Sequence, residues 1–392
     1  MESGPTSAQE DPLTVYLVTA EPGEAIWERF GHNGLWIHDD RTGEDVFWEW
    51  GLFSFSQRGF IPRLARGTML YSMGGRPLSR ALAVYRRQDR NVWAQELALT
   101  PDQERSLDQF VRNNALPENR QYIYDYYRDN CSTRVRDALD LVLGGRLRAE
   151  FAGEETGRTW RWHTRRLLRP APLADAGLQI VLGSPGDREI DAWQEMFLPM
   201  KLRERVASAV VPLENGDTVP LVRGEMRLVE GIGGPGPQEP AHRFPFAVVL
   251  GVLLGLWTAL LGWWAARSTL GRRALGLWMV AWGGVLGSIG MILAVAWLFT
   301  DHVFWRWNEN LLMANPVLLA VPFLALPLLA GREPPRRLLD LLRWVSWIAL
   351  AAVALKLVPG IFVQQNWGIV AALVPSHLMM ARVLPLPTAD PT

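Results

Sequence analysis

The sequence predicts a protein in two parts, an α+β domain followed by an α-helical membrane domain. Three observations lead to this fold class. Short apolar stretches separated by turn-forming residues fill positions 13–53, as in β-strands. Apolar residues at helical spacing recur between positions 100 and 142. From residue 244 onward, uncharged apolar runs of at least about 20 residues follow one another, and this is the length that spans a bilayer.

Composition limits the classes of function. The formal net charge is +0, so no overall positive field favours nucleic-acid binding. The 19 tryptophans fit a protein with much membrane-interface surface. The single cysteine, Cys131, excludes an intramolecular disulfide framework and a multi-cysteine zinc site. Residues 1–12 are polar and lack a basic-then-apolar signal pattern, so an export signal is expected to be missing from this chain.

The N-terminal part is predicted to begin with a strand and a β-hairpin. Three stretches have strand character: residues 13–20, 30–37 and 45–53. A turn-rich connection at residues 39–43 joins the second stretch to the third. Alternation places His32 on one face of its strand and Asn33 on the other. Glu49 lies midway along the third stretch, either near a cross-strand partner or as a solvated strand residue.

Two helices are predicted further along this part. The first starts at Pro101, with Thr100 as its N-cap. The second starts at Cys131, with Asn130 as its cap, and its buried stripe consists of Val135, Ala138, Leu139 and Val142. A helix N-terminus lowers the pKa of a thiol, because free backbone amides and the helix dipole favour the thiolate. A core cysteine would instead lie on the apolar stripe, although an inert buried thiol stays an alternative.

A thiol and a distant histidine are the minimum parts for covalent acyl transfer. His32 is the candidate base for Cys131, although an isolated histidine in a strand is more often structural. A metal site is the other alternative, formed by His32, His38, Asp39 and Asp40, but its ligand spacing is not specific. Residues 160–169 carry four arginines that would either meet phospholipid head groups or form a solvated helix face.

Five membrane spans are expected, with four or six as alternatives. They are residues 245–266, 274–299, 311–330, 341–359 and 361–381. Arginines gather in the first and third connections, so these connections are expected to face the cytoplasm. The part before residue 244 is then extracytoplasmic, together with the second connection, residues 300–310.

The second connection is rich in polar residues. His302, Asn308 and Asn310 would line a lipid or substrate cleft at the outer leaflet, or would belong to an interfacial belt. His377 in the last span is either functional or bonded to a neighbouring helix. The predicted boundaries are a polar tail at 1–12, an extracytoplasmic domain at 13–211, a Gly/Pro-rich linker at 212–243, a transmembrane helical domain at 244–384 and a C-terminal tail at 385–392.

Several motifs resemble the family called Lnb N-terminal periplasmic domain. They are residues 28–37 (ERFGHNGLWI), 129–134 (DNCSTR), 182–188 (LGSPGDR) and 193–199 (WQEMFLP). The loop at residues 301–312 looks like the matching membrane part. That family is similar to the circularly permuted papain-like group that includes lecithin–retinol acyltransferases and relatives of the NlpC/P60 hydrolases. The resemblance therefore implies a permuted papain-like (NlpC/P60-like) fold for the extracytoplasmic domain.

The resemblance also implies an activity, which is bacterial lipoprotein N-acylation. A phospholipid acyl chain would move through a thioester to the amino group of a lipidated N-terminal cysteine of a diacylated lipoprotein. The implied catalytic residues are Cys131 as nucleophile, His32 as base and Glu49 as the group that orients the histidine. The implied substrate-binding residues are Asn130, Arg134, His302, Asn308 and Asn310. No cofactor or metal is expected, and the implied location is the bacterial inner membrane with the N-terminal domain in the periplasm.

Two other functions stay open. The same thiol would cleave peptidoglycan peptides if the chain works like the NlpC/P60 relatives. Alternatively, the chain would be a non-catalytic envelope protein that binds lipid or a partner. Rapid labelling of Cys131 by a thiol reagent near neutral pH, dependent on His32, would favour an enzyme over a binding protein.

Overall fold

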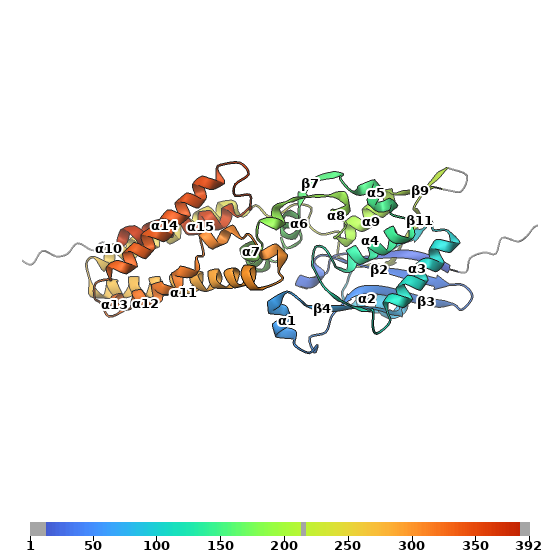
Figure 1. Cartoon of the computed structure of the whole chain (residues 1–392), viewed down its shortest axis with the longest axis horizontal. Coiled ribbons are helices and arrows are strands. Elements are labelled where there is room, and N and C mark those ends of the chain that lie inside the picture. The colour runs from blue at the N-terminus through green and yellow to red at the C-terminus, as the bar shows by residue number, and fades with distance from the viewer. Residues whose placement is uncertain (1–12, 213–216, 385–392) are drawn as a thin grey trace, which may run out of the picture. The chain divides into compact units, whose positions relative to one another are not determined.

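The computed structural model describes residues 13–212 and 217–384, and Figure 1 labels the elements. The chain divides into two compact units. Unit 1 comprises Met1–Leu64, Thr68–Ala171 and Glu189–Pro240, and unit 2 comprises Ala65–Gly67, Pro172–Arg188 and Ala241–Thr392. The predicted tails at 1–12 and 385–392 lie outside the described residues.

An antiparallel sheet of seven strands forms the centre of unit 1, in the order β11-β5-β1-β2-β3-β4-β6. Its strands are β1 (Leu13–Ala20), β2 (His32–Asp39), β3 (Glu44–Leu52), β4 (Leu70–Pro77), β5 (Val92–Leu97), β6 (Gln121–Ile123) and β11 (Val222–Val229). The predicted first strand and hairpin are confirmed, with Leu35 of β2 opposite Trp48 of β3. The N-terminal part is therefore a sheet domain of the mixed α/β class.

Helices cover both faces of this sheet. On one face, Leu17 and Leu35 are buried in a core that includes residues of α3 (Pro101–Asn114) and α4 (Cys131–Val142). On the other face, Phe47 packs with residues of α2 (Leu78–Arg87). Full burial of one such side chain stabilises the fold by about 1.5–3 kcal/mol. The alternation of the strands therefore supplies two apolar layers, and α4 is held against β2.

Shorter elements complete unit 1. They are α1 (Phe60–Arg66), α5 (Arg146–Phe151), α6 (Trp160–Leu167), α8 (Ala192–Glu195), α9 (Pro199–Ser208), the pair β7 (Glu155–Thr159) and β8 (Glu189–Asp191), and the pair β9 (Val210–Pro212) and β10 (Thr218–Pro220). Helix α1 crosses the boundary, since its last residues are assigned to unit 2.

Two expectations for unit 1 need correction. The segment predicted as a linker at 212–243 contains β11, because its backbone pairs with β5 and extends the sheet. Two of the four arginines at residues 160–169 belong to no solvated face, since Arg161 is 0% exposed and Arg166 is 4% exposed, whereas Arg165 is half-buried and Arg169 is exposed. Arg166 instead donates to His163 Nδ1 at 3.0 Å and to the carbonyl of Pro237 at 2.9 Å. These buried guanidinium groups are also out of reach of lipid head groups.

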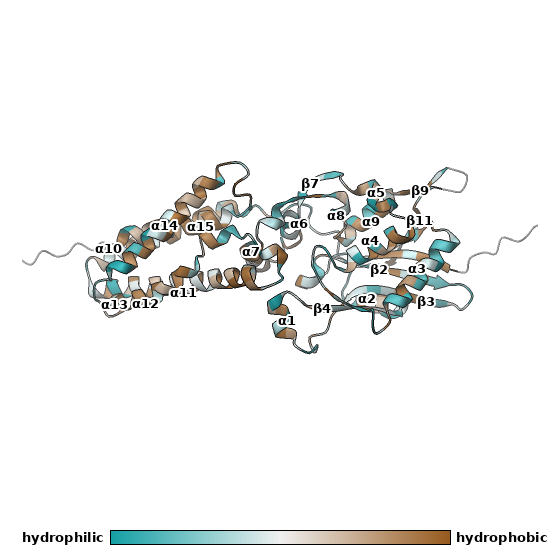
Figure 2. Ribbon diagram, in the orientation of Figure 1, coloured by the Kyte–Doolittle hydropathy of each residue, from teal (hydrophilic) through white to brown (hydrophobic). Residues whose placement is uncertain are grey.

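Unit 2 is helical, and Figure 2 shows the brown, hydrophobic colour of its long helices. In the described part of the chain, three helices are long and apolar enough to cross a membrane, by length and composition: α10 (Phe244–Ala265), α11 (Thr269–Phe299) and α14 (Arg336–Lys356). Two shorter apolar helical stretches are Glu309–Leu324 and α15 (Trp367–Val383). A Cβ at Gly251 of α10 would lie 2.0 Å from the carbonyl oxygen of Ala371, so a small residue there lets α15 pack closely.

The predicted third span, residues 311–330, is not one continuous helix. It contains parts or all of η4 (Glu309–Leu312), η5 (Pro316–Ala320), α12 (Val321–Leu324) and α13 (Leu326–Leu329). Pro316 is the first residue of η5, and Pro322 and Pro327 are the second residues of α12 and α13. Proline has no N–H to continue a preceding helix, so each proline lies in the first turn of a new short one. The predicted fifth span likewise starts later, at Trp367.

The structure also groups α7 (Pro172–Val181) with unit 2, although the predicted extracytoplasmic domain included these residues. The reason is the C-terminal end of α7, whose last carbonyl groups have no partner within the helix. Asn308 and Asn310 supply the missing donors, as described below.

Candidate active site

Helix α4 begins at Cys131, as predicted, because Asn130 caps it. Asn130 Oδ1 accepts hydrogen bonds from the N–H of Ser132 at 2.8 Å and of Thr133 at 2.9 Å. In return, the N–H of Asn130 donates to Thr133 Oγ1 at 2.8 Å. This reciprocal capping box satisfies backbone groups that a helix start leaves open. It thereby holds Cys131 in the first turn.

Asn130→Ala is expected to lower the free energy of unfolding by about 1–2 kcal/mol, because loss of a cap costs about this much. The variant also loses bonds from Asn130 Nδ2 to the carbonyl groups of Tyr126, at 3.0 Å, and Phe197, at 3.1 Å. Thermal unfolding of the detergent-solubilised full chain measures the effect. Asn130→Ser is the control, since it keeps a capping oxygen and should cost less. Equal destabilisation by both variants would contradict the capping role.

His32 is the first residue of β2, and its side chain hydrogen-bonds the Cys131 side chain. Gly51 lies next to both groups, since a Cβ there would be 3.5 Å from Cys131 Cβ and 3.9 Å from His32 Cε1. Its φ of +94° also favours glycine. The backbone N–H groups of Asn33 and Ser132 donate to the sulfur. The thiol therefore sits among an imidazole and two backbone donors.

Asn33 ties the histidine strand to the cysteine helix. Its side chain is fully buried, and its Nδ2 donates to Thr19 Oγ1 on β1 at 2.7 Å. Its Oδ1 accepts a bond from the Ser132 hydroxyl at 2.9 Å. This connection from β1 through β2 to α4 sets the position of Cys131 against His32. Sequence reasoning assigned no role to Asn33, although the residue stands directly after the candidate base.

Glu49 completes a line of three polar groups. Its Oε2 lies 2.9 Å from His32 Nε2, and only 3% of the residue is exposed. The alternative of a solvated strand residue is therefore wrong. Glu49 lies opposite Gly34 in the pairing of β3 with β2, which puts its side chain on the same face as that of His32. Because Glu49 engages Nε2, Nδ1 is the ring nitrogen left for Cys131.

Arg76 is the site residue that sequence reasoning missed. Its Nη2 lies 2.6 Å from Glu49 Oε1 and supplies a countercharge to the buried carboxylate. Arg76 belongs to β4, where Gly74 is the residue opposite Glu49. Two adjacent glycines weaken the strand signal of this stretch, which is why β4 was not predicted. Gly75 leaves room for the ring of Trp48, which would lie 2.6 Å from a Cβ there.

The electrostatics of the site favour a thiolate–imidazolium pair. Burial raises the pKa of Cys131, but the positive charge and hydrogen bond of His32 and the two backbone N–H groups outweigh burial and lower the pKa. Burial lowers the pKa of His32, whereas Tyr85, the Cys131 thiolate and the hydrogen bonds to Cys131 and Glu49 raise the pKa well above its ordinary value. These shifts favour the thiolate form of Cys131, and its role as a nucleophile stays a prediction.

The structure distributes the remaining predicted residues between the two units. Arg134, one turn into α4, pairs with Asp129, and its guanidinium lies 4.3 Å from the ring centroid of Tyr122. In unit 2, Asn308 and Asn310 are buried, and each donates from Nδ2 to the carbonyl of Ile180 at 2.9 Å. These amides thus cap the end of α7. The substrate-binding roles of Asn130, Arg134, Asn308 and Asn310 stay predictions.

His302 and His377 also have neighbours in unit 2. The ring of His302 stacks on Trp305 with 4.5 Å between ring centroids. His377 Nε2 lies 2.9 Å from the carbonyl oxygen of Met313, so it bonds to a neighbouring segment of the unit. A substrate role for His302 stays a prediction.

The metal alternative has no support in the described residues, where no group of three or more His, Cys, Asp or Glu side chains is arranged to hold a metal ion. His38 instead makes local bonds. Its Nδ1 lies 2.9 Å from Asp45 Oδ1, and its Nε2 lies 3.0 Å from Asp40 Oδ1.

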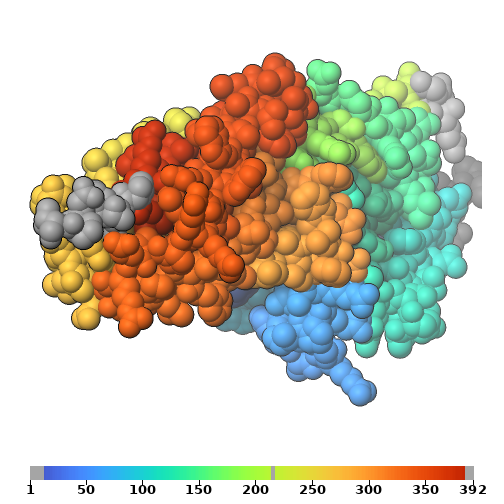
Figure 3. Space-filling model, turned by 60° about the vertical axis from the view of Figure 1, so that its left-hand side comes forward, coloured from blue at the N-terminus to red at the C-terminus, as the bar shows by residue number. Residues whose placement is uncertain are grey.

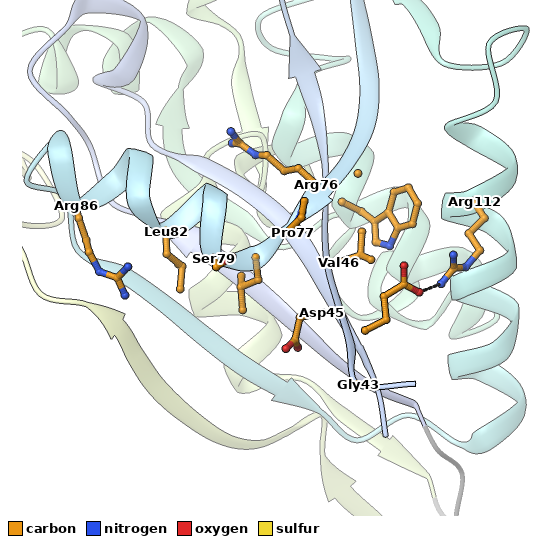
Figure 4. Close-up of a pocket in the computed structure, with 13 residues that line it drawn as sticks. Gly43, Asp45, Val46, Arg76, Pro77, Ser79, Leu82, Arg86 and Arg112 are labelled. Atoms are coloured by element: carbon orange, nitrogen blue, oxygen red, sulfur yellow. Dashed lines mark hydrogen bonds and ion pairs between the residues drawn. The ribbon is translucent and has the colours of Figure 1, made fainter. Parts of the chain in front are cut away.

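A cavity of about 700 Å³ opens in unit 1, and Figure 4 shows the residues that line it. Arg76 lines this cavity and also pairs with Glu49. Its other lining residues include Glu44 and Arg112, whose ion pair measures 3.2 Å (Figure 4). Cys131 and His32 do not line it. The Arg76–Glu49 pair therefore connects a residue that lines this cavity to the carboxylate beside His32.

Comparison with known proteins adds one finding. Residues 6–169 match the family model described as Lnb N-terminal periplasmic domain. No curated protein and no solved structure matches the chain. The match spans His32, Glu49 and Cys131, and it supports an Lnb-type family for this part of the chain. Together with the apolar helices, it indicates a membrane-associated envelope protein with a periplasmic N-terminal domain.

Proposed function

We propose that this chain is a lipoprotein N-acyltransferase of the bacterial inner membrane. It moves an acyl chain from a phospholipid, through a Cys131 thioester, to the amino group of a lipidated N-terminal cysteine. The observation that carries the proposal is the line Cys131–His32–Glu49, in which Glu49 is buried and the other two residues are half-buried. A periplasmic family match and membrane-length helices in the same chain support a substrate that resides in a membrane.

The permuted papain-like fold belongs to the same proposal. Support comes from the order of the parts, with a histidine at the start of β2 and a cysteine at the start of α4 on the neighbouring layer. Glu49 on β3 would take the place of the group that orients the histidine. Arg76, with Nη2 2.6 Å from Glu49 Oε1, would supply the countercharge to the carboxylate that holds the imidazolium.

In the first step, the Cys131 thiolate attacks the ester carbonyl carbon of a phospholipid, and a carbon–sulfur bond forms. The N–H groups of Asn33 and Ser132, which donate to the sulfur in this structure, would stabilise the developing oxyanion. The ester carbon–oxygen bond then breaks. The leaving alkoxide takes the proton of the His32 imidazolium, and lysophospholipid departs.

In the second step, the amino group of the lipidated cysteine attacks the thioester. His32, now neutral, removes a proton from the attacking nitrogen, and an amide bond forms. The carbon–sulfur bond breaks and returns Cys131 to its thiolate, paired again with the imidazolium. Water at this stage would hydrolyse the thioester, so transfer requires a site that excludes water.

Mass spectrometry of lipoprotein N-termini tests the proposal in a bacterial host that lacks its own N-acyltransferase. We expect N-acylated N-terminal peptides when this chain is expressed, and none when it is absent. N-acylation that persists with Cys131→Ala would contradict the thioester route. Cleavage of peptidoglycan peptides by the purified chain, without any N-acylation, would instead assign a hydrolase.

A further inference from the structure

A segment beside the site, residues 52–64 between β3 and β4, exposes large apolar side chains. Exposed fractions are 39% for Leu52, 74% for Phe55, 69% for Ile61 and 48% for Leu64. Helix α1, which starts in this segment, has no buried residue. Such a concentration of exposed apolar side chains marks surface that meets lipid or another protein. Figure 3 shows this segment, in blue, at the surface.

An aromatic row leads from this segment toward the thiol. Phe53 packs on Tyr71 with 5.0 Å between ring centroids, and Tyr71 stacks on Tyr124 at 4.1 Å. Burial and the charge of the nearby Cys131 raise the pKa of Tyr124 well above its ordinary value, so the ring stays neutral. At the strand end, Gly51 lies beside Cys131. The row Phe53–Tyr71–Tyr124 therefore extends from this segment to a ring that senses the charge of Cys131.

Positive charges are interleaved with these apolar residues. Arg58, Arg63 and Arg66 follow Phe55 at short intervals, and residues 52–66 contain no acidic residue. Apolar side chains combined with arginines are complementary to a lipid surface with phosphate head groups. A protein partner would not require this alternation of cations and large apolar groups.

The end of α1 connects to a helix of membrane length. Within unit 2, the N–H of Asp301 donates to the carbonyl of Arg66 at 2.8 Å, and the Arg66 guanidinium lies 3.8 Å from the Asp301 carboxylate. Asp301 stands two residues after Phe299, the last residue of α11. Arg66, the last residue of α1, is thus bonded within unit 2 to a residue close to the end of this apolar helix.

We propose that residues 52–64 insert into the outer leaflet of the membrane, and that the row Phe53–Tyr71–Tyr124 guides a phospholipid acyl ester from that leaflet to Cys131. This inference rests on the proposed function and names how its lipid substrate reaches the thiol. Insertion would also keep water away from the acylated sulfur.

Site-directed fluorescence in proteoliposomes tests the insertion. Because Cys131 is the single cysteine, Cys131→Ala provides a background for Phe55→Cys and Ile61→Cys, each labelled with an environment-sensitive dye. The matched control is Asp102→Cys on α3, where the side chain is 93% exposed. We expect lipids with a nitroxide on the acyl chain to quench the fluorescence of both segment labels at least about twofold more strongly than that of the control label. The reason is that an inserted segment places its labels at the boundary between head groups and acyl chains.

Two results would overturn the insertion. In the first, the segment labels are quenched by aqueous iodide rather than by lipid nitroxide, like the label at position 102, and the segment therefore stays in water. In the second, neither quencher reaches the segment labels, and protein therefore covers the segment.

An activity measurement tests delivery to the thiol. Phe55→Ser combined with Ile61→Ser is expected to lower the acylation of Cys131 by phospholipid vesicles by about tenfold or more, because each change removes apolar contact with lipid. Alkylation of Cys131 by a small soluble reagent should be unchanged, since neither Phe55 nor Ile61 belongs to the line Cys131–His32–Glu49. Ile232→Ser, at a residue 92% exposed elsewhere in unit 1, is the control and should acylate normally.

Failure of this inference differs from failure of the proposed function. If vesicles acylate Cys131 equally well in the double variant and the unaltered chain, delivery by the segment is wrong and acyl transfer stands. If the unaltered chain never acquires an acyl group, the proposed function is wrong, and the quenching result still decides whether the segment enters the membrane.

Discussion

Cys131→Ala is expected to abolish acyl transfer, with a loss of at least about 10⁴-fold, because the nucleophile itself is removed. Vesicles of phospholipid with an alkyne-tagged acyl chain supply the donor. The unaltered chain should acquire the tag, and neutral hydroxylamine should release it, as for a thioester. The variant should stay untagged. Cys131→Ser should transfer too slowly to detect, because a hydroxyl in this position is far less acidic than a thiol.

The control for this experiment is Ser208→Ala, at an exposed residue in the last turn of α9. It should be tagged like the unaltered chain. Thermal unfolding of each variant checks that the chain is folded. Tagging of the alanine variant, at any residue, would contradict Cys131 as the acyl carrier.

His32→Ala is expected to shift the pH dependence of Cys131 alkylation upward by at least about one pH unit. With His32 present, the imidazolium lowers the pKa of the thiol despite burial, so thiolate forms at lower pH than in an ordinary cysteine. Without the imidazolium, burial dominates and raises the pKa of Cys131. The alkylation rate by iodoacetamide near pH 7 should therefore fall about tenfold or more.

Glu49→Gln provides a graded comparison in the same assay. The Glu49 carboxylate helps to raise the pKa of His32, so its loss weakens the imidazolium next to the sulfur. The midpoint of alkylation should move upward, but by less than in His32→Ala. An unchanged midpoint in His32→Ala would show that the histidine does not ionise the thiol. The catalytic line would then have no electrostatic basis.

Local sequence signals were enough to predict the helices and strands whose formation depends on residues close together in the chain. The hairpin follows from alternating apolar residues around a turn, and the start of α4 follows from a capping asparagine before an apolar stripe. The apolar runs of α10, α11 and α14 are equally local. The proposed nucleophile was recognised because it is the unique cysteine and starts a helix, whereas His32 as its base rested on that cysteine and on the family resemblance.

The tertiary structure was needed to establish the burial and the partners of residues whose neighbours come from distant parts of the chain. The sequence placed Glu49 on a strand, but its burial and its pairing with Arg76 depend on the register of β3 with β4. Likewise, the pattern of α6 suggested exposed arginines, whereas packing against residues near Pro237 buries Arg166.

The sequence by itself determined the two-part organisation, the sheet-and-helix character of the first part, and the helix start that carries the thiol. These properties follow from hydrophobic periodicity and capping, which act over a few residues. Only the tertiary structure decided that His32, Glu49 and Arg76 lie in line with Cys131, and that Asn308 and Asn310 cap α7. Such arrangements depend on strand register and on packing between segments far apart in the chain, and no local pattern encodes them.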